Sequence, residues 1–273
     1  MQTVLLTGAA GTIGTVLRSY LSKRFKLVLT DTKAPEGLTN EETFMEADIT
    51  SKAEVRELMH GVDAVIHLGG IPVETDFESI EQVNITGTFH MMEAAAEAGV
   101  ERLIFASSIH AVGFYPADEW VDEASPVRPD TLYGVSKAYG EALGRYYHDK
   151  FGLKGIGVRI CNFQERPASG YDLENWFSPR DAERLFEAAL TCAVPEYLIV
   201  YGISNNTGQN LKTPGQKRLD TSHRIMQKIT PVKWREEALR KKEESLRRRT
   251  LEKKTGGETY AGSGAEDFRR RRC

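Results

Sequence analysis

The sequence predicts an α/β protein with a doubly wound parallel sheet. Two patterns lead to this prediction. Short apolar runs alternate with longer amphipathic stretches, and a glycine-rich turn joins the first apolar run to the first amphipathic stretch. The chain has 273 residues, which is enough to bury a substantial core. We therefore expect one main domain with helices on both faces of the sheet.

The expected strands and helices follow from the spacing of apolar residues. Short apolar runs predict buried strands at residues 4–6, 27–29, 64–67, 103–106, 155–160 and 197–201. Helical spacing predicts helices at residues 13–22, 52–60, 79–98, 131–151 and 179–190. Ser178, Pro179 and Asp181 are typical of a helix start, with serine as the cap and proline in the first turn. The alternation implies parallel strands joined by right-handed crossovers.

The composition of the chain narrows its class. The net charge is −3, so no overall field favours nucleic acid or a membrane surface. Cys161, Cys192 and Cys273 are scattered without the spacing of a zinc site, which indicates a reducing compartment and no metal. No apolar run reaches the roughly 18 residues that span a bilayer. We expect a soluble cytoplasmic protein that binds neither nucleic acid nor membrane.

A glycine-rich loop follows the first expected strand. Gly8, Gly11 and Gly14 surround the start of the first helix, where Thr12 and Ile13 also lie. Glycines at this spacing let backbone amides approach a pyrophosphate at a helix N-terminus. Asp31 ends the second strand, where a carboxylate can accept both hydroxyls of the adenosine ribose and repel a 2′-phosphate. The pattern predicts a Rossmann-type domain that prefers NAD over NADP.

Further cofactor contacts are expected at the ends of the next strands. Asp48 and Ile49 follow a third strand and could contact the adenine, although an ordinary loop aspartate is the alternative for Asp48. Leu68, Gly69 and Gly70 end the fourth strand, where small residues let the cofactor cross the sheet edge. We add Ser107 and Ile160 to the expected cofactor-binding residues.

Tyr133 and Lys137 are one helical turn apart and predict a catalytic pair. A free tyrosine has a pKa of about 10 and is a poor base at neutral pH. A neighbouring ammonium group and a positive nicotinamide would lower that pKa. Ser108 stands at the end of the fifth strand, where its hydroxyl could orient a substrate oxygen. Such a set suits hydride transfer at a carbinol or carbonyl carbon.

These motifs resemble the extended short-chain dehydrogenases/reductases, the NAD-dependent epimerase/dehydratase family. The resemblance covers residues 1 to about 207 and rests on the glycine loop, Asn84, Ser107-Ser108 and the Tyr133/Lys137 pair. It implies that Tyr133 is the acid/base and Lys137 its pKa modulator. It also implies that Ser108 is the substrate-oxygen donor and that Asn84 positions a water or the lysine.

Longer segments resemble the uronate dehydrogenase group in particular. They are residues 67–70, 106–110, 113–115, 128–137 and 176–181. Enzymes of that group use NAD⁺ to oxidise the anomeric carbon of a hexuronate, which gives an aldarolactone. A related branch oxidises glucose 6-phosphate. The resemblance implies a sugar substrate. The expected substrate contacts are Pro72, Ser108, Ile109, His110, Tyr133, Asn162 and Arg166.

Some positions depart from the group's pattern. Ile109 stands where the group usually has asparagine, and Pro72 stands where it usually has serine. The group presents an arginine shortly before the segment at 176–178, whereas residues 170–175 contain none. Arg166 is the nearest candidate for binding a substrate carboxylate. For His110, a buried structural histidine is the alternative to a substrate contact.

The chain changes character near Thr207. Residues 208–273 lack apolar periodicity and are rich in Lys and Arg, so we expect a basic tail that is disordered or weakly helical. Residues 1–207 are expected to form the NAD-binding domain, which also holds the catalytic residues and part of the substrate region. Codons for residues 216–231, shifted by one base, can encode Glu-Ala-Leu-Gly-Tyr-Lys-Pro-Gln-Asp-Asn-Ala-Glu-Asp-Tyr-Ala. That reading matches the usual ending of the group. Our hypothesis is an out-of-frame C-terminus, which would truncate the substrate region and reduce activity; a genuine basic extension is the alternative.

Two other functions remain open at this point. One is a nucleotide-sugar epimerase or dehydratase that keeps its NAD bound, and the other is a non-catalytic NAD-binding protein. Net release of NADH separates the first from a dehydrogenase. The resemblance also suggests a homo-oligomer that associates through the expected helices at 79–98 and 131–151.

Overall fold

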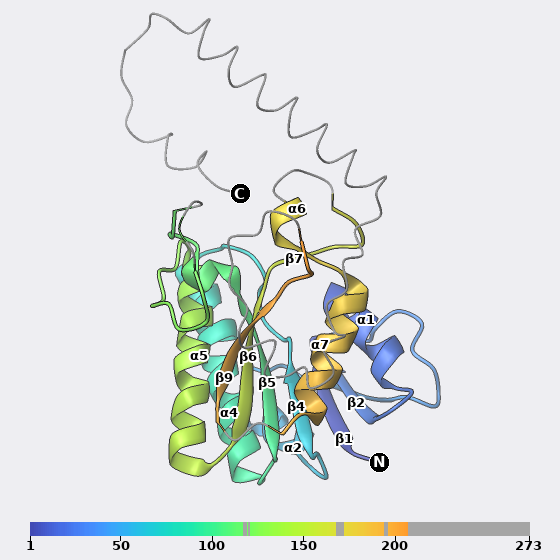
Figure 1. Ribbon diagram of the computed structural model, residues 1–273. Coiled ribbons are helices and arrows are strands. Elements are labelled where there is room, and N and C mark those ends of the chain that lie inside the picture. The colour runs from blue at the N-terminus through green and yellow to red at the C-terminus, as the bar shows by residue number, and fades with distance from the viewer. Residues whose placement is uncertain (117–118, 120, 168–171, 194–195, 207–273) are drawn as a thin grey trace, which may run out of the picture.

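The structure is a computed structural model that describes residues 1–116, 119, 121–167, 172–193 and 196–206. Within these residues, seven parallel strands form one sheet in the order β3-β2-β1-β4-β5-β6-β9 (Figure 1). They are β1 (Thr3–Thr7), β2 (Lys26–Asp31), β3 (Thr43–Glu46), β4 (Ala64–His67), β5 (Arg102–Ser108), β6 (Lys154–Ile160) and β9 (Leu198–Gly202). The strand order reverses between β1 and β4, and ligands of such sheets bind outside the carboxyl ends at this point. The predicted fold class is confirmed.

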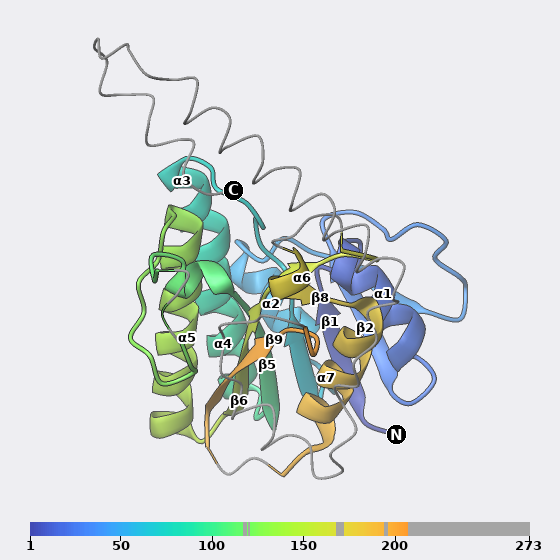
Figure 2. The same cartoon turned by 45° about the horizontal axis from the view of Figure 1, so that its top comes forward.

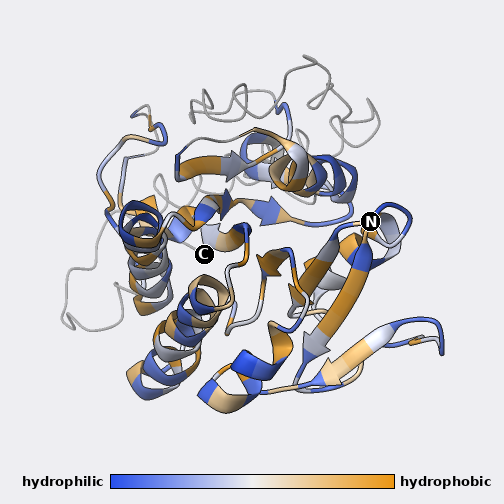
Figure 3. Ribbon diagram, turned by 90° about the horizontal axis from the view of Figure 1, so that it is seen from below, coloured by the Kyte–Doolittle hydropathy of each residue, from blue (hydrophilic) through white to orange (hydrophobic). Residues whose placement is uncertain are grey.

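Helices cover both faces of the sheet (Figures 1 and 3). On one face, α1 (Thr12–Leu21) packs beside α7 (Pro179–Thr191). On the other face, α4 (Gly87–Glu97) lies between α2 (Lys52–Leu58) and α5 (Leu132–Phe151). The strands in Figure 3 are mostly apolar, because a parallel sheet between two helical layers is buried on both sides.

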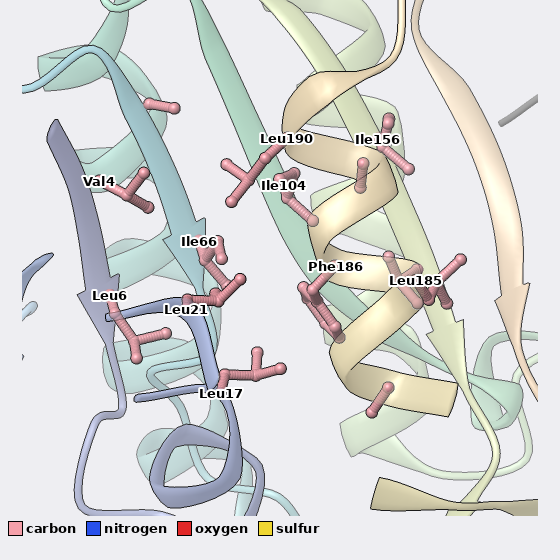
Figure 4. Close-up of a cluster of buried hydrophobic side chains, with 14 of the residues drawn as sticks. Val4, Leu6, Leu17, Leu21, Ile66, Ile104, Ile156, Leu185, Phe186 and Leu190 are labelled. Atoms are coloured by element: carbon pink, nitrogen blue, oxygen red, sulfur yellow. The ribbon is translucent and has the colours of Figure 1, made fainter. Parts of the chain in front are cut away.

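Each face of the sheet has its own apolar core. Figure 4 shows Leu17 of α1 and Phe186 of α7 in one cluster with Ile66 and Ile104 of the central strands. The opposite cluster brings Met91 and Met92 of α4 together with residues of α2 and the same strands. These cores hold the carboxyl ends of the strands in register, and the site is built on those ends.

The ends of the helices follow the expected sequence signals. Thr131 caps α5, since its Oγ1 accepts a hydrogen bond of 2.8 Å from the N–H of Gly134. Ser178 caps α7 in the same way, and Pro179 occupies the first turn, as predicted. No helix in the described part of the chain is long and apolar enough to cross a membrane.

The predicted helix at 79–98 is three elements in the structure. The short α3 (Phe77–Ser79) starts two residues earlier, because the Asp76 carboxylate accepts the N–H of Ser79 at 2.8 Å. A π-helical segment, η1 (Ile80–Thr86), leads into α4. Such wide turns are frequent at functional sites, and this one contains Asn84.

Several short elements were not given bounds by the apolar spacing, including the third strand that was expected before Asp48. Strand β3 lies at the sheet edge and is largely exposed, so it lacks the apolar run that marks the other strands. The 3₁₀ turn η2 (Ile109–Val112) follows β5. Strands β7 (Asn162–Phe163) and β8 (Trp176–Phe177) pair with each other after β6 in the chain. Figure 2 shows β8 beside α6 (Asp172–Asn175). Residues 207–273 lie outside the described residues. The expected basic tail and the segment of the reading-frame hypothesis fall within this range.

Candidate active site

A cavity of about 1830 Å³ extends over the carboxyl ends of the strands. It brings together most of the residues that the sequence singled out, from the glycine loop at one end to the tyrosine at the other. Its lining includes Gly8, Gly11, Thr12, Ile13, Gly14, Asp31, Asp48, Ile49, Leu68, Gly69, Gly70, Pro72, Ser107, Ser108, Ile109, His110, Tyr133, Lys137, Ile160 and Asn162. Asn84 and Arg166 are predicted site residues that lie outside this lining.

The glycine loop is shaped so that side chains cannot fill it. Gly8 has a φ of +67°, and a Cβ there would meet the backbone carbon of Leu68 at 2.9 Å. A Cβ on Gly14 would lie 2.1 Å from the carbonyl oxygen of Gly8. The N-terminus of α1 therefore lines the cavity with no side chain at Gly8 or Gly14 beside its backbone amides, which fits the diphosphate of a dinucleotide.

Asp31 stands at the end of β2, beside the glycine loop. Its Oδ2 accepts the N–H of Ala10 at 3.0 Å, and its Oδ1 accepts the N–H of Thr32 at 2.8 Å. A carboxylate has about four lone-pair sites, so these bonds orient the group and leave capacity for ribose hydroxyls. The geometry fits the adenosine end of NAD.

Tyr133 and Ser108 meet at the other end of the cavity. Tyr133 is in the first turn of α5 and Ser108 is the last residue of β5, so the start of the helix and the end of the strand converge there. Both residues are buried. Burial raises the pKa of Tyr133 above its usual value of 10.0, while a hydrogen bond with Ser108 acts in the opposite direction.

Lys137 lies behind the tyrosine in a largely apolar setting. Its Nζ is 5.4 Å from the centre of the Tyr133 ring and 5.1 Å from that of Phe105. Burial lowers the pKa of Lys137 to about 8. In the protein without its cofactor, burial is the main influence on the pKa of Tyr133. The role of Lys137 as the group that lowers this pKa stays a prediction.

His110 and Asp130 form a pair at the rim of the site. Nδ1 of His110 is 2.9 Å from Oδ1 of Asp130, and the imidazole packs edge-on against the Tyr133 ring at 5.7 Å. The His110 side chain is 43% exposed, so it is not the buried structural histidine that was the alternative. Since the carboxylate can only accept, it favours a proton on Nδ1 and leaves Nε2 free to accept from a ligand hydroxyl.

Asn84 is buried behind the loop that follows β4. Its Oδ1 accepts the N–H of Ile71 at 2.8 Å, and its Nδ2 donates to the carbonyl of Ile71 at 3.0 Å and to Oγ of Ser136 at 3.1 Å. It thus fastens the loop to the catalytic helix. Arg166 is exposed and outside the cavity lining, a placement that does not support its predicted contact with a substrate carboxylate.

A buried ion pair supports the floor of the site. Arg159 donates two hydrogen bonds of 2.9 Å to the carboxylate of Glu141, which also accepts the hydroxyl of Ser107 at 2.6 Å. Arg159 and Glu141 are only 2% and 7% exposed. Because breaking such a pair leaves an uncompensated charge inside the protein, it holds Ser107 and the neighbouring Ser108 firmly.

Sequence reasoning missed several residues that shape the site. Asp130, Glu141, Arg159 and Glu74 were not predicted, and all but Asp130 act from outside the cavity lining. Glu141 lies one turn beyond Lys137 on α5, which is the one signal that could have pointed to it. Asp130, Arg159 and Glu74 contact partners that lie 18 or more residues away in the chain, so local spacing does not indicate them.

Comparison with known proteins agrees with this geometry. The family model described as "NAD dependent epimerase/dehydratase family" matches residues 4–164. A uronate dehydrogenase of Pseudomonas syringae pv. tomato is 41% identical over 205 residues, covering 74% of this chain and 74% of that protein. An NAD-dependent glucose-6-phosphate dehydrogenase of Haloferax volcanii is 41% identical over 227 residues, covering 75% of this chain and 86% of that protein.

Solved structures give the same result. A uronate dehydrogenase from Agrobacterium tumefaciens superposes with a TM-score of 0.77 at 34% identity, covering 98% of this chain and 92% of that chain. A variant of that enzyme was solved in complex with NAD. A UDP-glucose 4-epimerase from Thermus thermophilus, at 23% identity and a TM-score of 0.65, shares the fold alone.

The glycine cradle, the carboxylate at the end of β2 and the matched residues lead to one conclusion. The predicted resemblance to the extended dehydrogenases is confirmed, and so is the prediction of an NAD cofactor. The matched region spans the glycine loop, Asp31 and the Tyr133/Lys137 pair. The chain belongs to the NAD-dependent epimerase/dehydratase family.

Proposed function

We propose that this protein is an NAD-dependent dehydrogenase that oxidises the anomeric carbon of a sugar to a lactone. The substrate class is a uronate or a related aldose or sugar phosphate. The observation that carries the proposal is the convergence of Tyr133, Ser108 and Lys137 at one end of a cavity whose other end is a glycine cradle. Similarity to a uronate dehydrogenase and to an NAD-dependent glucose-6-phosphate dehydrogenase supports it.

In this proposal Tyr133 removes the proton from the hydroxyl on the anomeric carbon. The Ser108 hydroxyl donates to the same oxygen and keeps it in line with the phenol. Since burial alone raises the pKa of Tyr133, the phenolate needs added positive charge. The Lys137 ammonium supplies one such charge and can also hold the nicotinamide ribose, and it stays protonated below about pH 8.

His110 is proposed to accept from a neighbouring sugar hydroxyl. Asp130 fixes its ring through Nδ1. Asn162, Pro72 and Ile109 line the same end of the cavity and would complete the substrate contacts. Two positions among these are apolar, which leaves His110 and Asn162 to supply the polar recognition on this side.

NAD would be held by the N-terminus of α1 and by Asp31, with the nicotinamide toward Tyr133. When bound, NAD⁺ supplies the acceptor for the hydride from the anomeric carbon. Thr12, Ile13, Asp48 and Ile49 would border the adenosine half, and Leu68, Gly69, Gly70, Ser107 and Ile160 the other half. The small residues at the end of β4 leave the edge of the sheet open for this crossing.

The exposed side of α5 supports the proposed homo-oligomer. Four large apolar or aromatic side chains of this helix are between 40% and 55% exposed, namely Leu132, Val135, Tyr146 and Phe151. A second copy packing on α4 and α5 would cover them. Light scattering coupled to gel filtration tests this, and a monomer at micromolar concentration would contradict it.

The test of the proposed function is NADH formation across a panel of uronates, aldoses and hexose phosphates. We expect NADH to accumulate in stoichiometric amounts with at least one of them. An epimerase or dehydratase would convert the sugar without net NADH. A protein that only binds NAD would form none.

The matched variant for this assay is Tyr133→Phe. Loss of a general base typically costs 10²- to 10⁴-fold, so we expect turnover to fall by about that factor. Binding of NAD, followed by fluorescence titration, should be kept because the ring remains in place. Undiminished turnover would exclude Tyr133 as the acid/base.

A further inference from the structure

The carboxylate of Glu74 is bound to the start of the catalytic helix. Its Oε1 accepts the N–H of Leu132 at 3.1 Å, and its Oε2 accepts the N–H of Tyr133 at 2.9 Å. Glu74 is 59 residues away from Tyr133 in the sequence, in the loop between β4 and α3. The backbone of the proposed acid/base is therefore held by a side chain from a different part of the fold.

Among the described residues, this contact is one of two hydrogen-bonded links between the same loop and α5. The other runs from Ile71 through Asn84 to Oγ of Ser136, and that hydroxyl donates to the carbonyl of Tyr133 at 2.7 Å. Glu74 thus holds the N–H of Tyr133, and Ser136 holds its C=O. Pro72, which lines the cavity, lies between the two attachment points.

We propose that Glu74 is a positioning residue: it fixes Tyr133 relative to the loop at residues 71–74 that forms one wall of the substrate end. The kinetic part of this inference rests on the proposed function. Glu74 does not touch the reacting atoms and is not itself part of the cavity lining, so it acts through the backbone of Tyr133.

The physical reason lies in the open end of the helix. The first N–H groups of a helix have no partner within it, and a carboxylate beside them is favoured by the helix dipole. Thr131 satisfies the N–H of Gly134, which leaves those of Leu132 and Tyr133 to Glu74. Without Glu74, water would take its place, and the exposed loop at Pro72 and Val73 would lose one of its two attachments.

A small displacement at this point has a large effect on rate. Shifts of about 1 Å in a reacting group can cost on the order of 10²-fold. We expect Glu74→Ala to lower kcat about 10- to 100-fold, with Kd for NAD unchanged because the glycine cradle is remote. Glu74→Gln keeps one strong acceptor and should restore part of the loss, whereas Glu78→Ala removes an exposed carboxylate from the adjacent α3 and should act like wild type.

The experiment combines kinetics with backbone amide exchange, followed by NMR, on the full chain. In the Glu74→Ala variant, exchange at Leu132 and Tyr133 should rise at least about tenfold, with no change in the interior of α5. In the Glu78→Ala variant it should not change. The exchange arm needs no substrate, so it decides the contact even if no sugar yields NADH and the proposed function fails.

The outcomes separate clearly. A fall in kcat with unchanged NAD affinity, faster exchange at the two amides and partial rescue by glutamine support the proposal. Unchanged kcat or unchanged exchange overturns it. A parallel loss of thermal stability, NAD binding and turnover also overturns it, because Glu74 would then be a general structural residue.

Discussion

Replacing Lys137 by methionine should make the protein without NAD more stable and inactive. The ammonium group is almost completely buried, and burial lowers its pKa from 10.5 to about 8. At 1.36 kcal/mol for each pH unit, this difference costs about 3 kcal/mol of folding free energy at neutral pH. Methionine has a similar shape and no charge, so it removes this cost. For a domain of this size, the gain corresponds to a rise in Tm of roughly 5–10 °C.

The sign of the pH dependence follows from proton binding. Between about pH 8 and 10.5 the unfolded lysine holds its proton while the folded one has lost it, so the stability of the wild type rises with pH in this window. The gap between Lys137→Met and wild type should therefore shrink by about 2 kcal/mol between pH 7 and pH 9.5. At high pH the two proteins converge.

Urea unfolding without NAD, at pH 7 and pH 9.5, measures both quantities. Lys150→Met is the control, because Lys150 is an exposed lysine on the same helix and should change the stability little. NADH formation should be lost only in Lys137→Met, since that variant lacks the charge that supports the Tyr133 phenolate. If Lys137→Met is less stable than wild type at pH 7, or if the gap is independent of pH, the reasoning about the buried ammonium is refuted.

Two further predictions concern the cofactor loop and the end of the chain. Gly14→Ala should cost about 1–3 kcal/mol of stability and weaken NAD binding, because its Cβ would lie 2.1 Å from the Gly8 carbonyl oxygen. Calorimetry measures both effects, with Ser19→Ala at an exposed position on the same helix as the control. An NAD affinity equal to that of the wild type would contradict this prediction. A chain that carries the shifted reading after residue 207 should have a higher Tm and a higher kcat than this one. The reading-frame hypothesis is refuted if the DNA around codon 207 contains no single-base shift that restores the ending. It is also refuted if the two chains have equal Tm and equal kcat.

Much of the fold could be predicted because parallel strands and their helices have strong local patterns. Apolar runs located six of the seven strands, and the cap at Ser178 located the start of α7. Strand β3 was missed as a run, since an exposed edge strand needs no apolar residues on both faces. The start of α3 was misplaced by two residues, because Asp76 acts as a cap through a local bond that the apolar spacing does not contain.

Two parts of the site could also be predicted from the sequence, because the residues within each part are close together in the chain. Gly8, Gly11 and Gly14 form one turn, and Tyr133 and Lys137 form one helical step. Arg166 was the weakest prediction. Its choice depended on distance along the chain from Trp176, and proximity in sequence within a loop does not determine the direction of a side chain.

The sequence by itself determined the family, the NAD-binding loop and the pair Tyr133/Lys137, because each depends on residue types at short, fixed spacings. Only the tertiary structure decided how those residues are held. Glu74 bonds to the backbone of Tyr133, Arg159 pairs with Glu141, and burial sets the pKa values of Tyr133 and Lys137. Such contacts join residues that are distant in the chain, and the loss of water around a group depends on everything packed over it. Neither can be obtained from local spacing.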